Sequence, residues 1–344
     1  MSESSNSGKL LRVAVDAMGG DCAPEEIVKG AAQAAKELGV EIILVGLKSE
    51  IEKELGKIDV SNLPISIVEA TDLIKDGEEA VYTVLRKPNS SVAVAAQLVK
   101  EGKAEAVVSA GSTGASTVCA FQYLGALPGL ERPMGGGAFL QLAPNTVVVD
   151  LGANVGCQPF QLVDFAVAGS VYARSFLGID EPTIGLLNVG AEEGKGNNQA
   201  KEAYSLLKKS GLNFIGNVEG MDIPLGKANV IVCDGFVGNI LIKFCEGIGR
   251  VINHWLSKEL KDTLSPADLE SITTKLHGLT SPAVALGGGP LLGVNGIFSI
   301  AHGSSRAPQI AGTVRNTKIA VETGFVDKLR TELEKVQVNI SSNE

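Results

Sequence analysis

The feature that most constrains this chain is an apolar run that ends in a glycine-rich turn and leads into a helix. Residues 13–15 (Val-Ala-Val) predict a short buried strand, and residues 16–21 (Asp-Ala-Met-Gly-Gly-Asp) follow it directly. Residues 24–38 then carry apolar side chains at helical spacing between a proline and a glycine, which predicts a helix. Glycines let backbone N–H groups approach a ligand closely, and a helix N-terminus favours anions. The turn at Gly19 and Gly20 therefore predicts one wall of an anion site.

The same order of elements recurs along the chain. Five further apolar runs end in small polar or glycine-rich turns, at residues 107–114, 147–154, 186–190, 230–239 and 297–305. Strands and amphipathic helices alternate between these turns, and this rhythm predicts a mostly parallel sheet in an α/β fold. Because the carboxyl ends of parallel strands meet at one edge of a sheet, we expect all six turns to share one ligand cleft.

The second half of the chain predicts a helical hairpin. Residues 238–260 and 266–276 have the apolar spacing of two helices with charged faces, joined by a short turn. We expect the hairpin, residues 240–280, to protrude from a single domain. That domain is predicted to span residues 10–336 and to close with one helix at 312–335.

The two ends and one uncharged segment are predicted to be less regular. Residues 1–9 are serine-rich and lack the apolar stretch of a signal peptide, so we expect a flexible tail there and another at 337–344. Residues 281–303 carry no Lys, Arg, Asp or Glu, but glycines, prolines and Asn295 interrupt them. This pattern predicts buried strand and loop instead of a membrane span.

Composition excludes several classes of partner. With 344 residues, of which 44% are hydrophobic, the chain can bury a large core, and its formal net charge of −9 argues against nucleic acid as a partner. The five cysteines are scattered, without a CxxC pair or a Cys/His cluster, so neither a zinc site nor a disulfide framework is predicted. A reducing cytoplasm fits this cysteine usage best.

Motifs of several common enzyme classes are missing from the sequence. No clean GxGxxG follows the first strand, residues 220–227 miss the phosphate-loop pattern, and there is no GxSxG. The histidines His254, His277 and His302 are too few and too scattered for a metal cage. We therefore expect neither a nucleotide cofactor nor a metal, and a covalent Ser-His-Asp route has little support.

One lysine stands out in what remains. Lys195 lies between Gly194 and Gly196, just before a predicted helix, where its ammonium group and the helix N–H groups would be aimed at one place. Such an arrangement predicts an anion or oxyanion site. A solvated lysine on a surface loop is the alternative.

Other residues at strand ends could likewise serve either in a binding site or in a purely structural role. Asp150 and Asp234 each end a strand and are followed four or five residues later by an amide, Asn154 or Asn239. These residues suit a binding site, and they equally suit helix N-caps. His302 is the only histidine in a strand-end turn, where a structural hydrogen bond is the alternative role.

Six motifs, in this order, resemble one family, the phosphate acyltransferases of bacterial phospholipid synthesis. They lie at residues 15–21, 109–115, 150–154, 216–220, 233–239 and 301–305. The resemblance covers nearly the whole chain. It implies a three-layer α/β/α Rossmann-like sandwich related to the phosphotransacetylases and to the isocitrate and isopropylmalate dehydrogenases.

The resemblance also implies a reaction and its partners. The expected enzyme transfers a long-chain fatty acyl group from acyl carrier protein to inorganic phosphate, giving acyl phosphate for phosphatidic acid synthesis by glycerol-3-phosphate acyltransferase. A cytoplasmic homodimer is implied, peripherally associated with the inner face of the cell membrane.

We expect three residues to act in catalysis, namely Lys195, Asn217 and His302. The predicted substrate-binding residues all lie in the turns or beside Lys195: Asp16, Gly19, Gly20, Gly111, Ser112, Thr113, Asn154, Glu192, Asp234, Asn239 and Ser304. The glycine turns would hold phosphate, while Lys195 and Asn217 would stabilise phosphate or the developing oxyanion. The small residues at Ser112 and Thr113 could equally be a tight helix start.

The predicted mechanism is direct attack of a bound phosphate oxygen on the acyl thioester, without a cofactor or an acyl-enzyme. Two other functions remain open at this point. One is a short-chain phosphotransacetylase that uses coenzyme A thioesters, and the other is a non-catalytic scaffold on the membrane for phospholipid enzymes.

Overall fold

The computed structural model describes residues 10–75, 77–280 and 287–342. The chain divides into two compact units. Unit 1 comprises residues 1–125, 286–290 and 294–321, and unit 2 comprises residues 126–285, 291–293 and 322–344. Each unit builds its own sheet, a division that the strand pattern alone does not show. The single domain over residues 10–336 stays a prediction.

Unit 1 has a six-stranded sheet in the order β10-β11-β4-β1-β2-β3. All its pairs are parallel except β10 with β11. The strands are β1 (Arg12–Asp16), β2 (Glu41–Gly46), β3 (Ile65–Glu69), β4 (Ala106–Ser109), β10 (Gly289–Pro290) and β11 (Ile297–Ile300). The helices are α1 (Glu25–Leu38), α2 (Lys48–Leu55), α3 (Ala80–Arg86), α4 (Ser91–Lys100), α5 (Thr113–Leu124) and α11 (Ala307–Glu322).

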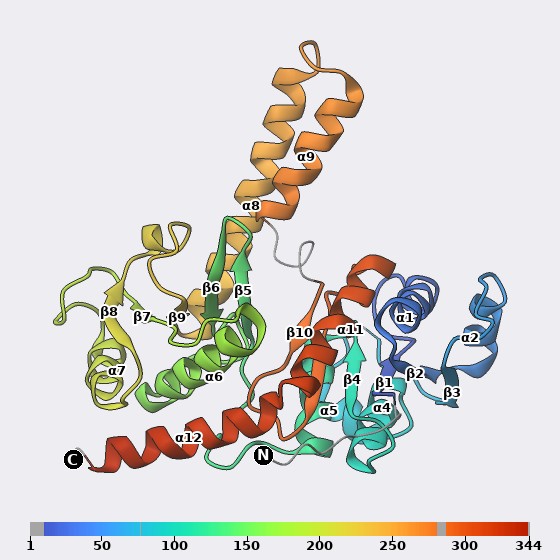
Figure 1. Ribbon diagram of the computed structural model, residues 1–344, viewed down its shortest axis with the longest axis horizontal. Coiled ribbons are helices and arrows are strands. Elements are labelled where there is room, and N and C mark those ends of the chain that lie inside the picture. Colours follow the sequence, from blue (N-terminus) through green and yellow to red (C-terminus); the bar gives the residue numbers. More distant parts are fainter. Residues whose placement is uncertain (1–9, 76, 281–286, 343–344) are drawn as a thin grey trace. The chain divides into compact units, whose positions relative to one another are not determined.

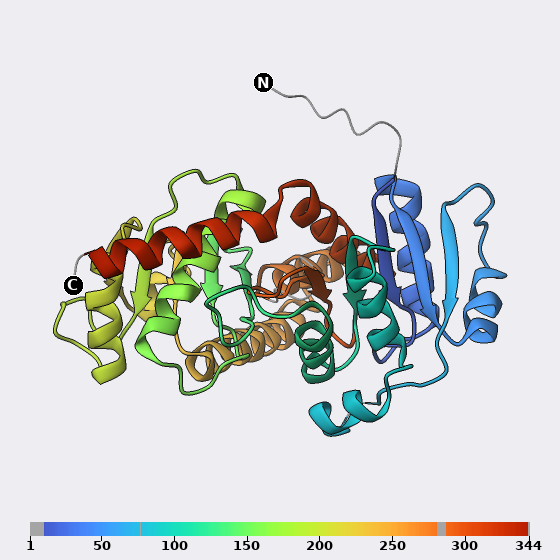
Figure 2. The ribbon, with the colours of Figure 1, turned by 90° about the horizontal axis from the view of Figure 1, so that it is seen from below.

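Alternation along β1 creates the two helical layers of unit 1. Successive side chains of a strand point to opposite faces. Val13 and Val15 join a buried cluster with Ile27 of α1 and Ile310 of α11, whereas α4 packs against β1 and β2 outside that cluster. Figure 2 shows α1 running alongside β1 and β2. Unit 1 is thus an α/β/α sandwich, as predicted.

Unit 2 has a five-stranded sheet in the order β5-β6-β9-β7-β8. Only the β5–β6 pair is antiparallel. The strands are β5 (Gly136–Leu140), β6 (Ala143–Val149), β7 (Ile184–Leu187), β8 (Phe214–Val218) and β9 (Val230–Val232). The helices are α6 (Pro159–Leu177), α7 (Asn198–Lys209), the 3-10 turn η1 (Gly220–Asp222), α8 (Gly235–Leu260), α9 (Pro266–Thr280) and α12 (Phe325–Ser342).

Helices cover both faces of this second sheet. On one face, α6 packs on β6 and β9, and Gly169 lets the helix come close to Val230. On the other face, Leu241 and Ile242 of α8 pack against a buried cluster that includes Phe139 and Ile231. This arrangement repeats the predicted three layers.

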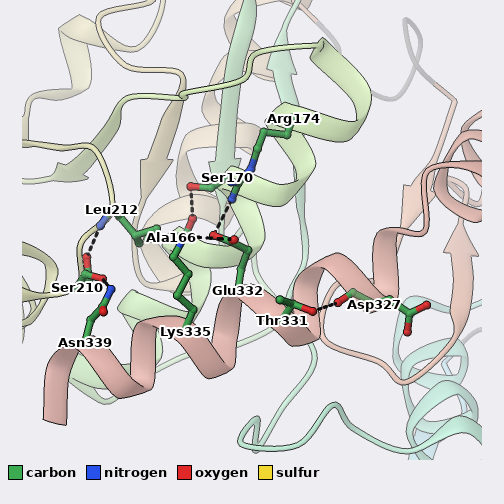
Figure 3. A network of polar contacts seen from close by, with 10 residues as sticks. All are labelled: Ala166, Ser170, Arg174, Ser210, Leu212, Asp327, Thr331, Glu332, Lys335 and Asn339. Carbon is green, nitrogen blue, oxygen red and sulfur yellow. Dashed lines mark hydrogen bonds and ion pairs between the residues drawn. The ribbon is translucent and has the colours of Figure 1, made fainter. Parts of the chain in front are cut away.

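The last helix packs along α6, and polar contacts fix it there (Figures 2 and 3). Arg174 of α6 donates to Glu332 at 3.1 Å, and the Asn339 side chain donates to the Ser210 carbonyl at 2.9 Å. Residues 337–342 are therefore helical, and the prediction of a flexible tail at 337–344 is wrong over those six positions. Residues 343–344 lie outside the described residues.

One predicted closing helix, at 312–335, is in fact two. Gly324 takes a left-handed conformation with φ of 63°, which ends α11 before α12 starts at Phe325. The predicted tail at residues 1–9 and the stretch 281–286 lie outside the described residues. The rest of segment 281–303 forms β10, β11 and connecting loops, as expected.

The predicted helical hairpin is present as α8 and α9. Its two helices extend away from the sheet of unit 2 (Figure 1). Gly249 of α8 lies close against Thr280 of α9, since a side chain at Gly249 would overlap the threonine. Within the described residues, none of the helices is long and apolar enough to cross a membrane.

Candidate active site

The turns that follow β1, β4 and β11 lie at one edge of the unit 1 sheet. β1 lies between β4 and β2, and the chain leaves it in one direction through α1 and returns on its other side at β4. Ligands of open α/β sheets bind at such a switch point, beyond the carboxyl ends of the strands. The Asp21 N–H donates to the Gly303 carbonyl at 2.8 Å, which joins the turn after β11 to the turn after β1.

Asp16 fixes the first turn from inside. It is 2% exposed, and its carboxylate accepts from the Ser109 hydroxyl at 2.7 Å and from the Met18 N–H at 3.2 Å. Burial raises the pKa of Asp16 above its ordinary value. These hydrogen bonds hold the turn from inside, and Asp16 also lines a small pocket at this edge of the sheet. Its role in substrate binding stays a prediction.

The glycines of these turns are required by close backbone contacts. A Cβ on Gly19 would lie 2.7 Å from the Gly111 nitrogen, and one on Gly20 would lie 3.0 Å from the carbonyl oxygens of Ala110 and Gly303. Gly20 also has a φ of 105°, which side chains disfavour. Gly19, Gly20 and Gly111 thus form one tightly packed backbone surface.

The N-terminus of α5 completes this group. Ser112 is the N-cap, and its hydroxyl accepts from Ala115 at 3.5 Å. Thr113 begins the helix, so its N–H has no partner within the helix. A small pocket here is lined by the Asp16 carboxylate, by Gly19 and Gly111, and by hydroxyl-bearing residues that include Ser91, Ser112 and Ser116. Hydroxyls and helix N–H groups of this kind can donate hydrogen bonds to an anion.

His302 and Ser304 lie in the exposed turn after β11. The His302 Nδ1 is 2.9 Å from the Ser304 hydroxyl and accepts from the Ser304 N–H at 3.3 Å. The structural hydrogen bond considered for His302 is therefore present, and Nε2 is the ring atom left to face a ligand.

In unit 2, Lys195 lies in the loop between β7 and α7, residues 188–197, which we call the Lys195 loop. Its backbone N–H donates to the Glu192 carbonyl at 3.1 Å, and its own carbonyl accepts from Asn188 at 3.1 Å. The side chain is exposed, and among the described residues its ammonium group has no hydrogen bond or ion pair. The ammonium group of Lys195 is therefore free to bind an anion. The backbone hydrogen bonds hold the loop in place.

Asn217 holds the same loop from the sheet. It is 5% exposed, and its Nδ2 donates to the Glu192 carbonyl at 2.8 Å. Its Oδ1 is buried without a hydrogen-bond partner among the described groups. Asn217 thus positions the Lys195 loop. Glu192 contributes its backbone to this contact, and its side chain is exposed.

The turn after β6 folds around Asp150. This carboxylate is fully buried and accepts from the backbone of Gly135 at 2.9 Å and of Asn154 at 2.6 Å. Burial raises the pKa of Asp150 despite these hydrogen bonds. The Asn154 side chain donates to the Pro133 carbonyl at 2.8 Å, and its Oδ1 is buried without a partner in the described structure.

Asp234 caps α8 and joins three elements. Its carboxylate accepts from Phe236 in the first turn of α8 at 2.8 Å and from the backbone of Cys157 at 2.7 Å, with the Gln199 side chain at 3.4 Å. Although burial opposes it, these hydrogen bonds hold the pKa of Asp234 below its ordinary value. The N-cap interpretation of Asp234 is confirmed. Asn239, one turn further along, is exposed beside Gly152.

The cysteines near these turns are poor nucleophiles. Burial raises the pKa of the Cys157 thiol to about 12, and it also raises the pKa of Cys233. The thiolate is the reactive form of cysteine. Neither thiol is therefore poised for covalent catalysis at neutral pH.

A pocket of about 500 Å³ lies at the carboxyl ends of β7 and β9. Part of its wall is the Lys195 loop, through Asn188, Val189, Gly196 and Asn197, and the rest is mostly apolar. The volume is in the ordinary range for small-molecule sites. The pocket places apolar space directly beside the loop that carries Lys195.

Comparisons with known proteins fit this arrangement. The family model described as "Fatty acid synthesis protein" matches residues 11–328. A phosphate acyltransferase from Desulforamulus reducens is 46% identical over 331 residues, covering 94% of this chain and 98% of that relative. One from Thermosynechococcus vestitus is 45% identical over 326 residues, covering 93% and 94%. The chain belongs to the phosphate acyltransferase family.

Membership makes the chain an acyltransferase enzyme of fatty acid and phospholipid synthesis, as the six motifs predicted. The fold agrees with that of a phosphotransacetylase from Streptococcus pyogenes. That structure has a TM-score of 0.60 at 20% identity and covers 92% of this chain and 95% of its own. At this identity the likeness shows a shared fold.

The structure of this phosphate acyltransferase brings the predicted residues into two groups, one in each unit. In unit 1 these are Asp16, Gly19, Gly20, Gly111, Ser112, Thr113, His302 and Ser304, and in unit 2 they are Asn154, Glu192, Lys195, Asn217, Asp234 and Asn239. The expectation that all six turns share one cleft stays a prediction.

Sequence reasoning missed two contributors to the unit 2 group. The Gln199 side chain donates to the Cys157 carbonyl and reaches Asp234, so it links α7 to the turns after β6 and β9. Nothing in the local sequence around Gln199 or Cys157 indicates this contact, because it depends on where two distant turns meet.

Proposed function

We propose that this phosphate acyltransferase transfers a long-chain fatty acyl group from acyl carrier protein to inorganic phosphate. The observation that carries the proposal is the mostly apolar pocket of about 500 Å³ beside the Lys195 loop. An acetyl group would leave most of such a volume unfilled, whereas a fatty acyl chain gains from burying each methylene.

In the proposed reaction, a phosphate oxygen attacks the thioester carbonyl carbon. The new C–O bond forms, the C–S bond breaks, and the carrier leaves as a thiolate, which takes up the proton that hydrogen phosphate gives up. Phosphate is already anionic at neutral pH, so no strong general base is needed. Positioning of the two substrates supplies about 7–11 kcal/mol in favourable cases, and one well-placed oxyanion donor supplies about 3–4 kcal/mol.

Each group of residues has a proposed part in this reaction. The backbone surface of Gly19 and Gly111 and the start of α5 at Ser112 and Thr113 hold phosphate, since they offer N–H and hydroxyl donors. Lys195 stabilises the negative charge that develops on the thioester oxygen. Its freedom from ion pairs among the described residues supports that role.

The remaining residues keep these groups in place. Asn217 positions the Lys195 loop through the Glu192 carbonyl, and Asp234 holds the start of α8 against the turn after β6. Asn154, Asn239, His302 and Ser304 organise their turns.

A homodimer is part of the proposal and has a candidate contact on α8. Phe244, Ile248, Val251 and Trp255 are between 43% and 66% exposed and repeat at helical spacing on one face. An apolar stripe of this kind is typical of a helix that packs on another protein surface. Light scattering on the purified protein should give twice the chain mass, and Val251→Glu should shift it towards the monomer. A monomeric native protein would contradict this part.

The cellular context is proposed from the family resemblance. It comprises the cytoplasm, peripheral contact with the membrane and delivery of acyl phosphate to glycerol-3-phosphate acyltransferase. Flotation with anionic vesicles tests the membrane contact, since a protein that stays at the bottom of the gradient does not bind them.

The donor distinguishes this function from its alternatives. The purified protein is incubated with phosphate and either palmitoyl-acyl carrier protein or acetyl-coenzyme A, and acyl phosphate is trapped with hydroxylamine. We expect hydroxamate from the carrier donor only when phosphate is present. Preference for acetyl-coenzyme A would identify a phosphotransacetylase, and vesicle binding without any hydroxamate would identify a scaffold.

A further inference from the structure

The pocket beside the Lys195 loop has two chemically different parts. Its polar wall consists of Asn188, Asn197, Gln199 and Asp234, at the ends of β7 and β9 and the start of α7. Its apolar wall consists of Leu162, Leu186, Leu187, Ala200, Cys233, Val237 and Leu241. A ligand that enters here meets polar groups along one side and hydrocarbon along the other.

The apolar wall belongs to the folded core of unit 2. Leu162 of α6 is 2% exposed and Leu186 of β7 is 1% exposed, so both are held in fixed positions. Leu241 of α8 packs against the buried cluster that contains Ile231 and Cys233. A wall made of side chains on helices and strands defines the size of a ligand better than a wall made of loops.

The polar wall already has partners for its charged group. Asp234 accepts hydrogen bonds from Cys157 and Phe236, which leaves this carboxylate engaged in capping α8. Among the described residues that line the pocket, none offers a free cation or carboxylate to bind a charged ligand tail. Its apolar wall fits an uncharged hydrocarbon chain.

Exposed apolar side chains continue from the pocket to the surface. Val189 of the Lys195 loop is 81% exposed, and Val237 at the start of α8 is 41% exposed. Both line the pocket. Apolar side chains that are exposed at the mouth of a pocket are typical of a site that receives an apolar ligand.

We propose that this pocket is the subsite for the fatty acyl chain, and that Leu162 and Leu241 set the chain length that the enzyme prefers. The inference rests on the proposed function, because it deepens the same site. The thioester end would lie towards the Lys195 loop, and the terminal methylenes would pack against Leu162, Leu186 and Leu241.

The alternative occupant is the amide-bearing prosthetic arm of the carrier protein. The two occupants differ in a measurable way. Narrowing the subsite for the chain lowers activity with long chains more than with short chains, since each methylene that loses its burial costs about fourfold in kcat/KM. Narrowing a site for the arm lowers activity equally for all chains, because every donor carries the same arm.

The test measures kcat/KM with acyl carrier proteins that carry chains of graded length, from eight to eighteen carbons. Leu241→Phe should lower the ratio of long-chain to short-chain activity, by about fifteenfold if two methylenes are excluded. Leu241→Ala should move the preference towards longer chains. Val237→Phe is a second narrowing variant at a more exposed position, in case the bulkier residue at 241 disturbs folding.

Val338→Phe is the matched control. It makes a similar enlargement at a position of α12 that is 63% exposed and does not line the pocket. We expect it to leave the ratio unchanged. The inference is overturned if Leu241→Phe and Val237→Phe also leave the ratio of long-chain to short-chain activity unchanged and lose activity equally for all chains. The pocket would then be assigned to the prosthetic arm.

A binding measurement separates failure of this inference from failure of the proposed function. A fluorescent long-chain fatty acid is titrated into the native protein and the variants. If no acyl phosphate forms from any carrier donor, the proposed function fails. Binding that Leu241→Phe weakens and Val338→Phe does not would still support the subsite, while equal binding by all three proteins would refute it.

Discussion

Replacing glycine by alanine is expected to have opposite effects on stability at two positions of α8. Gly238 lies in the first turn of the helix, where a Cβ would overlap the Asp150 carbonyl oxygen. Gly247 lies further along α8, and a Cβ there would meet nothing within 4 Å. Gly238→Ala should therefore destabilise unit 2, and Gly247→Ala should stabilise it.

The magnitude at Gly238 follows from how firmly Asp150 is held. Its N–H donates to the Cys233 carbonyl at 3.0 Å, and its carboxylate accepts from Gly135 and Asn154. Moving this backbone away from a new methyl group would weaken buried hydrogen bonds worth about 1 kcal/mol each. Overpacking in a close-packed region typically costs about 1–3 kcal/mol. We expect a net loss of about 2–3 kcal/mol.

At Gly247 the expected sign is the reverse. Replacing an interior helix glycine by alanine contributes about 0.8–1 kcal/mol when nothing clashes. The two variants should thus differ by about 3–4 kcal/mol in the free energy of unfolding of unit 2.

The assay is urea unfolding followed by fluorescence. The chain has one tryptophan, Trp255, which lies on α8 and therefore reports on this helix. Far-ultraviolet circular dichroism on the same samples reports on the whole chain. If Gly238→Ala unfolds at the same urea concentration as the native protein, or shifts in the same direction as Gly247→Ala, the close approach of α8 to Asp150 is refuted.

Three further predictions concern charge and hydrogen bonding. Lys195→Ala should lower turnover by about 10²–10³-fold, the usual effect of losing one oxyanion donor. Lys201→Ala, on the exposed face of α7, is the control and should leave turnover unchanged. Full turnover of Lys195→Ala would contradict the role of Lys195. Asn217→Ala and Asn217→Asp should lower turnover to a similar extent, because neither can donate to the Glu192 carbonyl; an Asp variant as active as the native protein would refute that positioning role. Burial, with a smaller contribution from Glu131, raises the pKa of Asp164 to about 7. This folded-state pKa lies above the unfolded value, so stability falls as the pH rises towards 7. Asp164→Asn should then raise the unfolding midpoint at pH 8 but not at pH 4, and equal shifts at both would contradict the assignment.

Local sequence patterns predicted most of the elements that carry the site. The strands before Asp16, Asp150 and Asp234 are runs of buried aliphatic residues, and their burial by layers on both faces is the physical reason the pattern is clear. The helices α1 and α8 were likewise predicted, because their glycines, the proline before α1 and their apolar spacing mark them.

Elements without such marks were missed. β5 begins at Gly136 in a glycine-rich stretch without a strand-like apolar run, and it forms because β6 pairs with it. Helix α3 has few buried residues, Thr83 and Val84, so its apolar spacing carries little signal. The division into two sheets was also missed, since strand order depends on contacts between distant segments.

For the candidate site, the types of the residues predicted where the side chains lie better than they predicted what the side chains do. Asp16 and Asp234 are where expected, but they bind backbone and hydroxyl groups of the protein itself. Asn217 is also in place, and its role as a holder of the Lys195 loop appears only in the hydrogen bond to Glu192. A carboxylate or amide at a strand end has the same sequence signature in either role.

The central claim is that phosphate itself attacks the thioester on this enzyme. A single-turnover experiment with enzyme in excess over palmitoyl-acyl carrier protein, with and without phosphate, tests it most directly by following release of the carrier thiol. We predict that thiol is released only with phosphate, together with one equivalent of acyl phosphate. A stoichiometric burst of thiol without phosphate would show an acyl-enzyme and contradict the account.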